Sequence, residues 1–223
     1  MNDGEEYYEF MQQRFPDTEF FVFGTGGYGT LQEYMVLNDT VDEIRPDLIL
    51  WQFCNNDFAD NSHDYEVLFN REHIGVRPYL EEENIVYRMN RRYDLPIRYS
   101  VKSAHLLLTA VEAIQASCSP KPGFDSKEFR QARAVTLDLL GKVKARSNAP
   151  VYFFDACGSL PEVADLCRDA GMICLPDIAG ILKEESKIIG ETLYLEDGHW
   201  NPAGNRIAGN ILADYFEKNK ILT

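Results

Sequence analysis

The stretch from residue 195 to residue 205, Leu-Glu-Asp-Gly-His-Trp-Asn-Pro-Ala-Gly-Asn, holds the residues whose types and spacing best fit acid–base chemistry. Asp197 stands two residues before His199. A carboxylate at that spacing can hold one imidazole nitrogen and leave the other free to accept a proton, as a general base does. The alternative interpretation is a capping loop whose histidine only packs.

A helix is predicted directly after this histidine. Asn201 is a suitable N-cap, and Pro202 suits the first helical position because proline lacks an N–H that would be unpaired there. His199 is therefore expected on a loop just before a C-terminal helix. The apolar residues that follow at helical spacing predict its buried face: Ile207, Ile211, Leu212, Tyr215 and Phe216.

A glycine-rich turn at residues 24–30 is the second candidate for chemistry. It follows an apolar run at residues 20–23, which predicts a strand covered on both faces, and it precedes a predicted helix at residues 31–44. Gly27 and Gly29 allow the backbone to approach an anion closely. The turn lacks the lysine of a phosphate-binding loop and the glycine spacing of a dinucleotide site, so a plain strand-to-helix turn fits equally well.

An asparagine pair follows the next predicted strand, at residues 48–53. Asn55, Asn56 and Asp57 come directly after it. Since ligands gather at the carboxyl ends of strands in open parallel sheets, the glycine turn and the asparagine pair are expected at the same edge. Ordinary turn chemistry is the alternative for such a polar cluster.

The remaining pattern alternates strands and helices, which predicts a doubly wound α/β sheet in a single domain spanning residues 1–223. An insertion at about residues 60–98 breaks this order and is expected to form a hairpin around the acidic turn at 81–83. The other predicted elements are helices at 5–15 (with Asp3 as cap), 99–117, 126–146 and 160–170, and strands at 150–155 and 172–175.

Composition narrows the classes of partner. The formal net charge of −14 over 223 residues argues against binding to nucleic acid or to an anionic membrane. No apolar run approaches the roughly 18 residues of a membrane span. The five cysteines cannot all pair and lack metal-ligand spacing, so they are interpreted as buried apolar residues. No metal and no cofactor are predicted.

Three pieces occur in one order along the chain: the glycine turn at 26–30, the asparagine pair at 55–57, and Asp-Gly-His-Trp-Asn at 197–201. Together they resemble the SGNH (GDSL-like) hydrolase family, in its D-x-H-W-N branch. The resemblance implies a three-layer α/β/α, flavodoxin-like fold with a parallel sheet. It also implies the activity of an esterase, a lipase or a carbohydrate O-deacetylase.

The resemblance also implies a role for individual residues. His199 is the expected general base and Asp197 its orienting acid, while Gly27 and Asn56 are the expected oxyanion donors. The family usually places its acid three residues before the histidine, where this chain has Glu196. Both acids therefore remain open. Further candidates lie beside these positions: Asn55, Asp57 and Gly29.

The family's nucleophile is the feature that this chain lacks. In the family, the serine lies in a Gly-Asp-Ser turn after the first strand, ahead of the helix predicted here at 5–15. None of the serines between Ser62 and Ser186 has that context. Ser159 is the nearest imitation, and it is expected to cap a helix. We therefore expect the first strand and the serine to be missing from residues 1–223, and the exposed sheet edge to associate with another segment or subunit.

Three functional interpretations follow. The first is a serine hydrolase acting on a small-molecule or glycan ester. The alternative is a non-hydrolytic SGNH-like protein that binds an acylated ligand or a protein partner. A further alternative is acyl transfer of the O-acetyltransferase kind.

Overall fold

The computed structural model describes residues 4–69, 75–90, 97, 100–118 and 122–222. The protein is a mixed α/β protein with a parallel three-stranded sheet, as the alternation of strands and helices predicts. It forms two compact units. Unit 1 comprises Met1–Gly24, Pro46–Asn55 and Ala149–Thr223, and unit 2 comprises Thr25–Arg45 and Asn56–Asn148. The prediction of a single domain at 1–223 stays a prediction.

The parallel sheet belongs to unit 1. Its strands are β1 (Ile49–Phe53), β4 (Val151–Asp155) and β5 (Ile173–Cys174), in the order β1-β4-β5. The central strand β4 is buried at four of its five residues, as expected of a strand covered on both faces. All three strands were predicted, although β5 is shorter than the run at 172–175.

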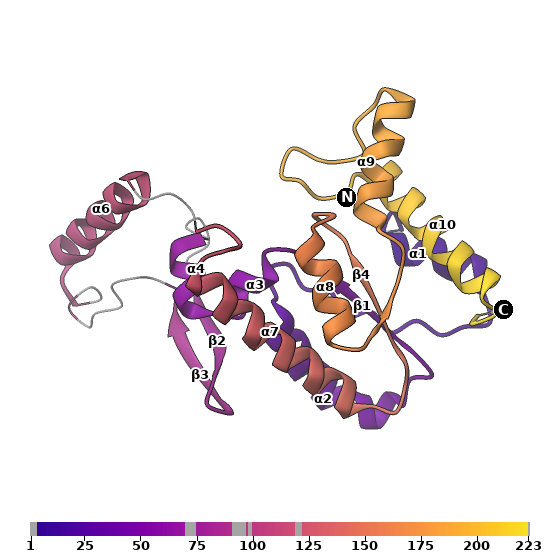
Figure 1. Ribbon diagram of the computed structural model, residues 1–223, viewed down its shortest axis with the longest axis horizontal. Helices are drawn as coiled ribbons and strands as arrows, with labels where there is room; N and C mark the ends of the chain where they lie inside the picture. The colour runs from indigo at the N-terminus through magenta and orange to yellow at the C-terminus, as the bar shows by residue number, and fades with distance from the viewer. Residues whose placement is uncertain (1–3, 70–74, 91–96, 98–99, 119–121, 223) are drawn as a thin grey trace. The chain divides into compact units, whose positions relative to one another are not determined.

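The helices of unit 1 are α1 (Tyr7–Arg14), α8 (Pro161–Asp169), α9 (Ile178–Ile189) and α10 (Pro202–Lys218). α1 and α10 lie side by side (Figure 1). Their apolar faces join β4 in one core that includes Met11, Phe15, Phe154, Leu212 and Phe216. The cap predicted at Asp3 lies outside the described residues. α9 was not predicted, although Asp177 caps its start and Gly190 its end.

The strand predicted at residues 20–23 is wrong. These residues form no strand, and the side chains of Phe21, Val22 and Phe23 are about half exposed, at 52%, 47% and 49%. An apolar run becomes a strand only where a neighbour pairs its backbone groups. Within the described residues, no strand pairs with this run, and β1 pairs only with β4, so β1 is an edge of the sheet.

Unit 2 is built on the packing of α2 (Thr30–Ile44) against α7 (Lys127–Arg146). Short helices α3 (Asp57–Asp60) and α4 (His63–Phe69) contact α7, where the rings of Phe58 and Phe129 meet edge to face at 5.0 Å. α7 was predicted to span residues 126–146, and Ser126 is its N-cap, because the Ser126 side chain accepts a hydrogen bond from the Phe129 N–H. The unit also contains α6 (Lys102–Cys118).

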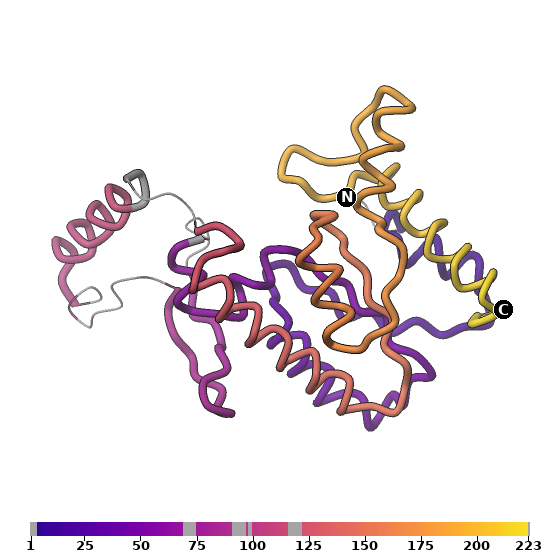
Figure 2. Tube along the Cα trace, viewed as in Figure 1, coloured from indigo at the N-terminus to yellow at the C-terminus, as the bar shows by residue number. Residues whose placement is uncertain are grey.

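The inserted segment of unit 2 forms the predicted hairpin. Strands β2 (Val76–Glu81) and β3 (Asn84–Met89) pair antiparallel and run side by side in Figure 2. The turn between them, at Glu82 and Glu83, has φ values of 45° and 69°. Positive φ at both central residues matches the twist of a two-residue hairpin turn.

The interpretation of the cysteines as unpaired apolar residues is wrong for four of the five. Cys54 and Cys157 form one disulfide, and Cys167 and Cys174 form another. Cys54 directly follows β1 and Cys157 follows β4, so the parallel pairing of these strands brings the two Cα atoms to 5.1 Å. That separation lies within the range that a disulfide spans. Strand pairing, which sequence spacing does not show, therefore decides this bond.

Among the described residues, no helix is both long and apolar enough to cross a membrane. The same part of the chain contains no group of three or more histidine, cysteine, aspartate or glutamate side chains that could hold a metal ion.

Candidate active site

The loop that carries His199 is a tight hairpin in unit 1. Tyr194 and Trp200 form an antiparallel bridge, and the Leu195 N–H donates to the His199 carbonyl at 2.7 Å. Gly198 closes the turn with a φ of +88°, a conformation that glycine adopts without strain. Trp200 is buried and stacks on Phe154 of β4. The base of the loop is thus fixed in the core, and its tip is exposed.

The helix after the loop begins as predicted. The Asn201 side chain accepts a hydrogen bond from the Gly204 N–H at 2.9 Å, with Pro202 at the first helical position. Asn205 is buried and donates to the Trp200 carbonyl at 3.0 Å, while its Oδ1 accepts from the Tyr7 N–H at 3.1 Å. α10, the loop and α1 are therefore joined by a buried amide.

Asp197 and His199 are brought together at the exposed tip. Asp197 Oδ1 lies 3.1 Å from His199 Nδ1 and also accepts from the His199 backbone N–H at 3.1 Å. These hydrogen bonds, the backbone one first, lower the pKa of the Asp197 carboxyl. In the described part of the chain, Asp197 is the carboxylate that contacts this ring, and Glu196 is exposed beside it. A ring held at Nδ1 keeps Nε2 for accepting a proton.

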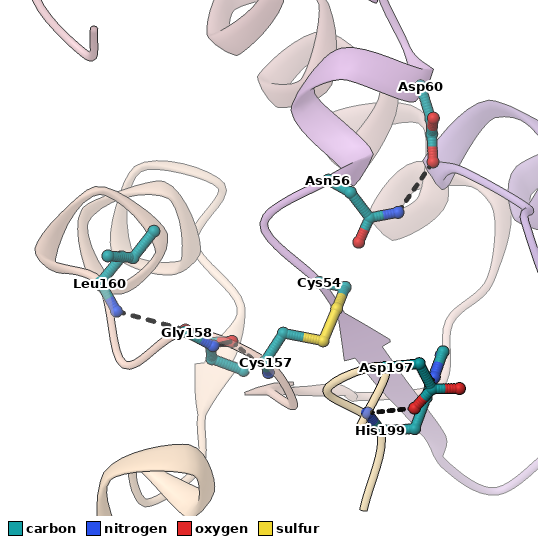
Figure 3. The surroundings of a disulfide bond; sticks show 9 residues. Cys54, Asn56, Asp60, Cys157, Gly158, Leu160, Asp197 and His199 are labelled. Atoms are coloured by element: carbon teal, nitrogen blue, oxygen red, sulfur yellow. Dashed lines mark hydrogen bonds and ion pairs between the residues drawn. A yellow bond between two sulfur atoms is a disulfide. The ribbon is translucent and has the colours of Figure 1, made fainter. Parts of the chain in front are cut away.

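The surroundings of the Cys54–Cys157 disulfide include Asp197 and His199 (Figure 3). After β4, the Asp155 carboxylate accepts from the N–H groups of Cys157 and Gly158, at 2.8 and 3.0 Å. These hydrogen bonds hold the turn at the carboxyl end of β4.

Ser159 was expected to cap a helix, but it does not cap α8. Leu160 occupies the N-cap position, and the Ser159 hydroxyl donates instead to Asp177, whose other oxygen caps α9. Ser159 has a φ of 55°. Its hydroxyl is thus committed to a carboxylate and not to an imidazole base.

The predicted oxyanion donors Gly27 and Asn56 both belong to unit 2. Gly27 has a φ of +81°, and its carbonyl accepts from Arg77 Nη1 at 2.5 Å. Gly29 is the N-cap of α2 and packs so closely that a Cβ atom there would lie 2.7 Å from Asp60 Cβ. Gly27 is therefore required by its positive φ, and Gly29 by the close approach of Asp60, which leaves no room for a side chain.

The side chain of Asn56 is held by the helix that it precedes. Its Nδ2 donates to Asp60 Oδ2 at 2.9 Å (Figure 3). Asp57, at the start of the same helix, is 3% exposed. The other predicted neighbour, Asn55, belongs to unit 1, and so do Asp197, Glu196 and His199.

Sequence analysis missed a cluster of buried charges in unit 2. Arg77 Nη2 lies 3.3 Å from Asp60 Oδ1, and Arg77 Nε lies 3.2 Å from Glu66 Oε1. The side chains of Asp60, Glu66 and Arg77 are only 1%, 0% and 11% exposed. Burial and the charge of Asp60 also raise the pKa of Glu33 to about 8. Nothing in the spacing of these residues distinguishes them from the many surface acids of the chain.

No protein-family model, curated protein or solved structure matches the chain. The resemblance to SGNH hydrolases therefore rests on the three sequence pieces alone.

Proposed function

We propose that the chain is the SGNH-type domain of a serine hydrolase that cleaves a carboxylic ester. The observation that carries the proposal is the contact of Asp197 Oδ1 with His199 Nδ1, at 3.1 Å, on a loop fixed to the core by Trp200. Ester cleavage needs a base with a fixed tautomer, and this contact supplies one.

The finer fold, a three-layer α/β/α flavodoxin-like domain, is part of the same proposal. It is supported by the parallel order β1-β4-β5 and by the strand–helix–strand sequence β4–α8–β5. The exposed run at 20–23 and the open edge of β1 also agree with a sheet that needs one more strand.

In the proposed reaction, the serine oxygen bonds to the ester carbonyl carbon while its proton passes to His199 Nε2. The resemblance assigns the stabilisation of the negative charge that develops on the carbonyl oxygen to the Gly27 N–H and to Asn56 Nδ2. His199 then returns the proton to the leaving alkoxide, and water hydrolyses the acyl-serine by the same route. No serine of residues 1–223 has the family's context, so the proposal assigns the nucleophile to a preceding Gly-Asp-Ser turn.

The test is hydrolysis of 4-nitrophenyl acetate by a form of the protein that carries an apolar strand ending in Gly-Asp-Ser ahead of residue 1. We expect turnover that is lost when this serine is replaced by alanine. Equal turnover by the extended form and by its serine-to-alanine variant would overturn the proposal. The unextended chain should show no serine-dependent hydrolysis; fast turnover abolished by Ser159→Ala would instead identify Ser159 as the nucleophile.

The same extended form tests the oxyanion donor. Asn56→Ala should lower kcat by about 10²-fold or more, the usual loss for one such donor. Because the Asn56 amide bonds to the side chain of Asp60, far-UV circular dichroism should accompany the assay as a control for folding. An unchanged kcat would remove Asn56 from the reaction.

The absence of a serine in the family's context favours a second candidate, a non-hydrolytic protein that binds an acylated ligand. In that case the extended form would show no turnover but would still bind a non-hydrolysable ester analogue in an Asn56-dependent way. Acyl transfer, the further alternative, would appear as an ester product formed with an added alcohol.

A further inference from the structure

The two proposed oxyanion donors share one network of hydrogen bonds and ion pairs inside unit 2. Asn56 Nδ2 donates to Asp60 Oδ2 at 2.9 Å, and Asp60 Oδ1 lies 3.3 Å from Arg77 Nη2. The same guanidinium donates to the Gly27 carbonyl at 2.5 Å. Asn56 and Gly27 are thus connected through two intervening side chains.

We propose that Arg77, carried by strand β2, is a positioning residue that fixes both Gly27 and the Asn56 amide for oxyanion binding. This inference rests on the proposed function. It assigns the hairpin at Val76–Met89 a role within the site, because the insertion supplies the guanidinium that joins the two donors.

At Gly27, Arg77 holds the peptide bond between Gly27 and Tyr28. The Gly27 N–H, which is the proposed donor, belongs to the preceding peptide, and Arg77 positions it through the backbone angles of Gly27, whose φ is +81°. The Gly27 carbonyl accepts from Arg77, and the N–H of the same peptide, from Tyr28, donates to the Thr25 carbonyl at 3.1 Å. Arg77 Nη1 also lies 3.0 Å from Gln32 Oε1, which in turn accepts from the Gly29 N–H at 3.2 Å. The glycine turn is therefore held at two places by one side chain and its partner.

At Asn56, the network fixes which way the amide points. An ionised carboxylate only accepts hydrogen bonds, so Asp60 must face the Nδ2 group and not the Oδ1 atom of Asn56. The Nδ2 group carries two hydrogens. One is used by Asp60, and the other can donate to an oxyanion.

Arg77 also makes the Asp60 carboxylate compatible with this task. An uncompensated negative charge beside Asn56 would oppose the build-up of negative charge on a substrate oxygen. The Asp60 side chain is 1% exposed, and its pairing with the guanidinium, which it shares with Glu66, offsets part of that charge. Glu66 holds the other side of Arg77 and accepts hydrogen bonds from Tyr79 and from Asn90. Asp60 and Glu66 therefore both hold the Arg77 guanidinium in place.

The test is site-resolved hydrogen exchange by NMR on the 223-residue chain. In Arg77→Gln, exchange of the Tyr28 N–H and of the Asn56 side-chain N–H should accelerate by about tenfold or more. The Asn56 signal is identified by its loss in Asn56→Ala. The helical amides of Leu139 and Leu140 in α7 report global stability, and their exchange should change much less.

Arg88→Gln is the matched control, since Arg88 lies on the same hairpin but pairs with Glu81 at the surface. If Arg77→Gln fails to fold, exchange is measured instead in the double variant Arg77→Gln/Glu66→Gln, which removes one of the two buried negative charges that face Arg77. Unchanged exchange at Tyr28 and Asn56 in a folded variant, an equal rise at Leu139 and Leu140, or the same rise in Arg88→Gln would each overturn the proposal. Exchange does not depend on catalysis, so failure of this network and failure of ester hydrolysis are distinguishable.

Discussion

Asp197 Oδ1 contacts His199 twice, with the backbone N–H and with Nδ1 each at 3.1 Å. A carboxylate in this place favours the neutral tautomer that carries its proton on Nδ1. Asp197→Asn should therefore reduce that preference, which long-range ¹H–¹⁵N NMR of the His199 ring measures directly. In the extended form, the same substitution should lower kcat nearly as much as His199→Ala.

Glu196→Gln is the matched control for that experiment. Glu196 is an exposed neighbour of Asp197, so its neutral variant should leave both the ring tautomer and kcat close to the parent values. A crippling effect of Glu196→Gln together with a mild effect of Asp197→Asn would show that the orienting acid is Glu196.

Loss of the proton from the buried Glu33 carboxyl should lower the free energy of unfolding as the pH rises. Burial first, and then the charge of Asp60, raise its pKa from 4.5 to about 8 in the folded state. The folded state therefore binds the proton more tightly than the unfolded state does. This stabilisation is complete below pH 4.5 and is lost as the pH rises from there to about 8.

Glu33→Gln should remove this contribution to the pH dependence, because glutamine does not titrate. The free energy of unfolding of the parent, relative to Glu33→Gln, should fall by at most about 5 kcal/mol between pH 4.5 and pH 8, since one pKa unit corresponds to about 1.4 kcal/mol. Urea titrations of both proteins at several pH values measure this difference in the free energy of unfolding. A difference that does not vary with pH would contradict the shifted titration of Glu33.

The two disulfides should differ in what they contribute to stability. Cys54 and Cys157 are 103 residues apart, whereas Cys167 and Cys174 are 7 apart. In the chain-entropy model, a longer closed loop restricts the unfolded state more. Replacing the Cys54–Cys157 pair with serine should cost about 2 kcal/mol more than replacing the Cys167–Cys174 pair. Chemical denaturation of the two double variants tests this, and equal losses would be the contrary result.

Gly204 should not tolerate a side chain. A Cβ atom at this position would lie 2.3 Å from the Leu193 carbonyl oxygen, at the base of the loop that carries His199. We expect Gly204→Ala to lower the free energy of unfolding by about 1–3 kcal/mol, the usual cost of overpacking. Chemical denaturation provides the measurement.

Gly141→Ala is the control for this steric argument. Gly141 lies in α7, and a Cβ atom there would meet nothing within 4 Å. Alanine should stabilise the helix by about 0.5–1 kcal/mol. A similar loss of stability in both variants would mean that the Gly204 contact is not the cause.

The sequence by itself determined the elements whose signals are local. Asn201 and Pro202 mark the start of α10 because capping involves only residues within one turn. The turn at Glu82 and Glu83 likewise joins the predicted hairpin strands. The pairing of Asp197 with His199, two residues apart, was also within reach of sequence analysis.

Only the tertiary structure decided the features that join distant residues. The run at 20–23 has the composition of a buried strand, yet it stays exposed because strand formation depends on a neighbour that composition does not supply. Cys54 finds Cys157 through the pairing of β1 with β4. Arg77 lies on the inserted hairpin and contacts Gly27 and Asp60, which lie earlier in the chain. Their separations in sequence match neither helical nor strand periodicity, so no sequence pattern indicates these contacts. A buried charge is stable only beside its partner, and that partner is chosen by packing in three dimensions.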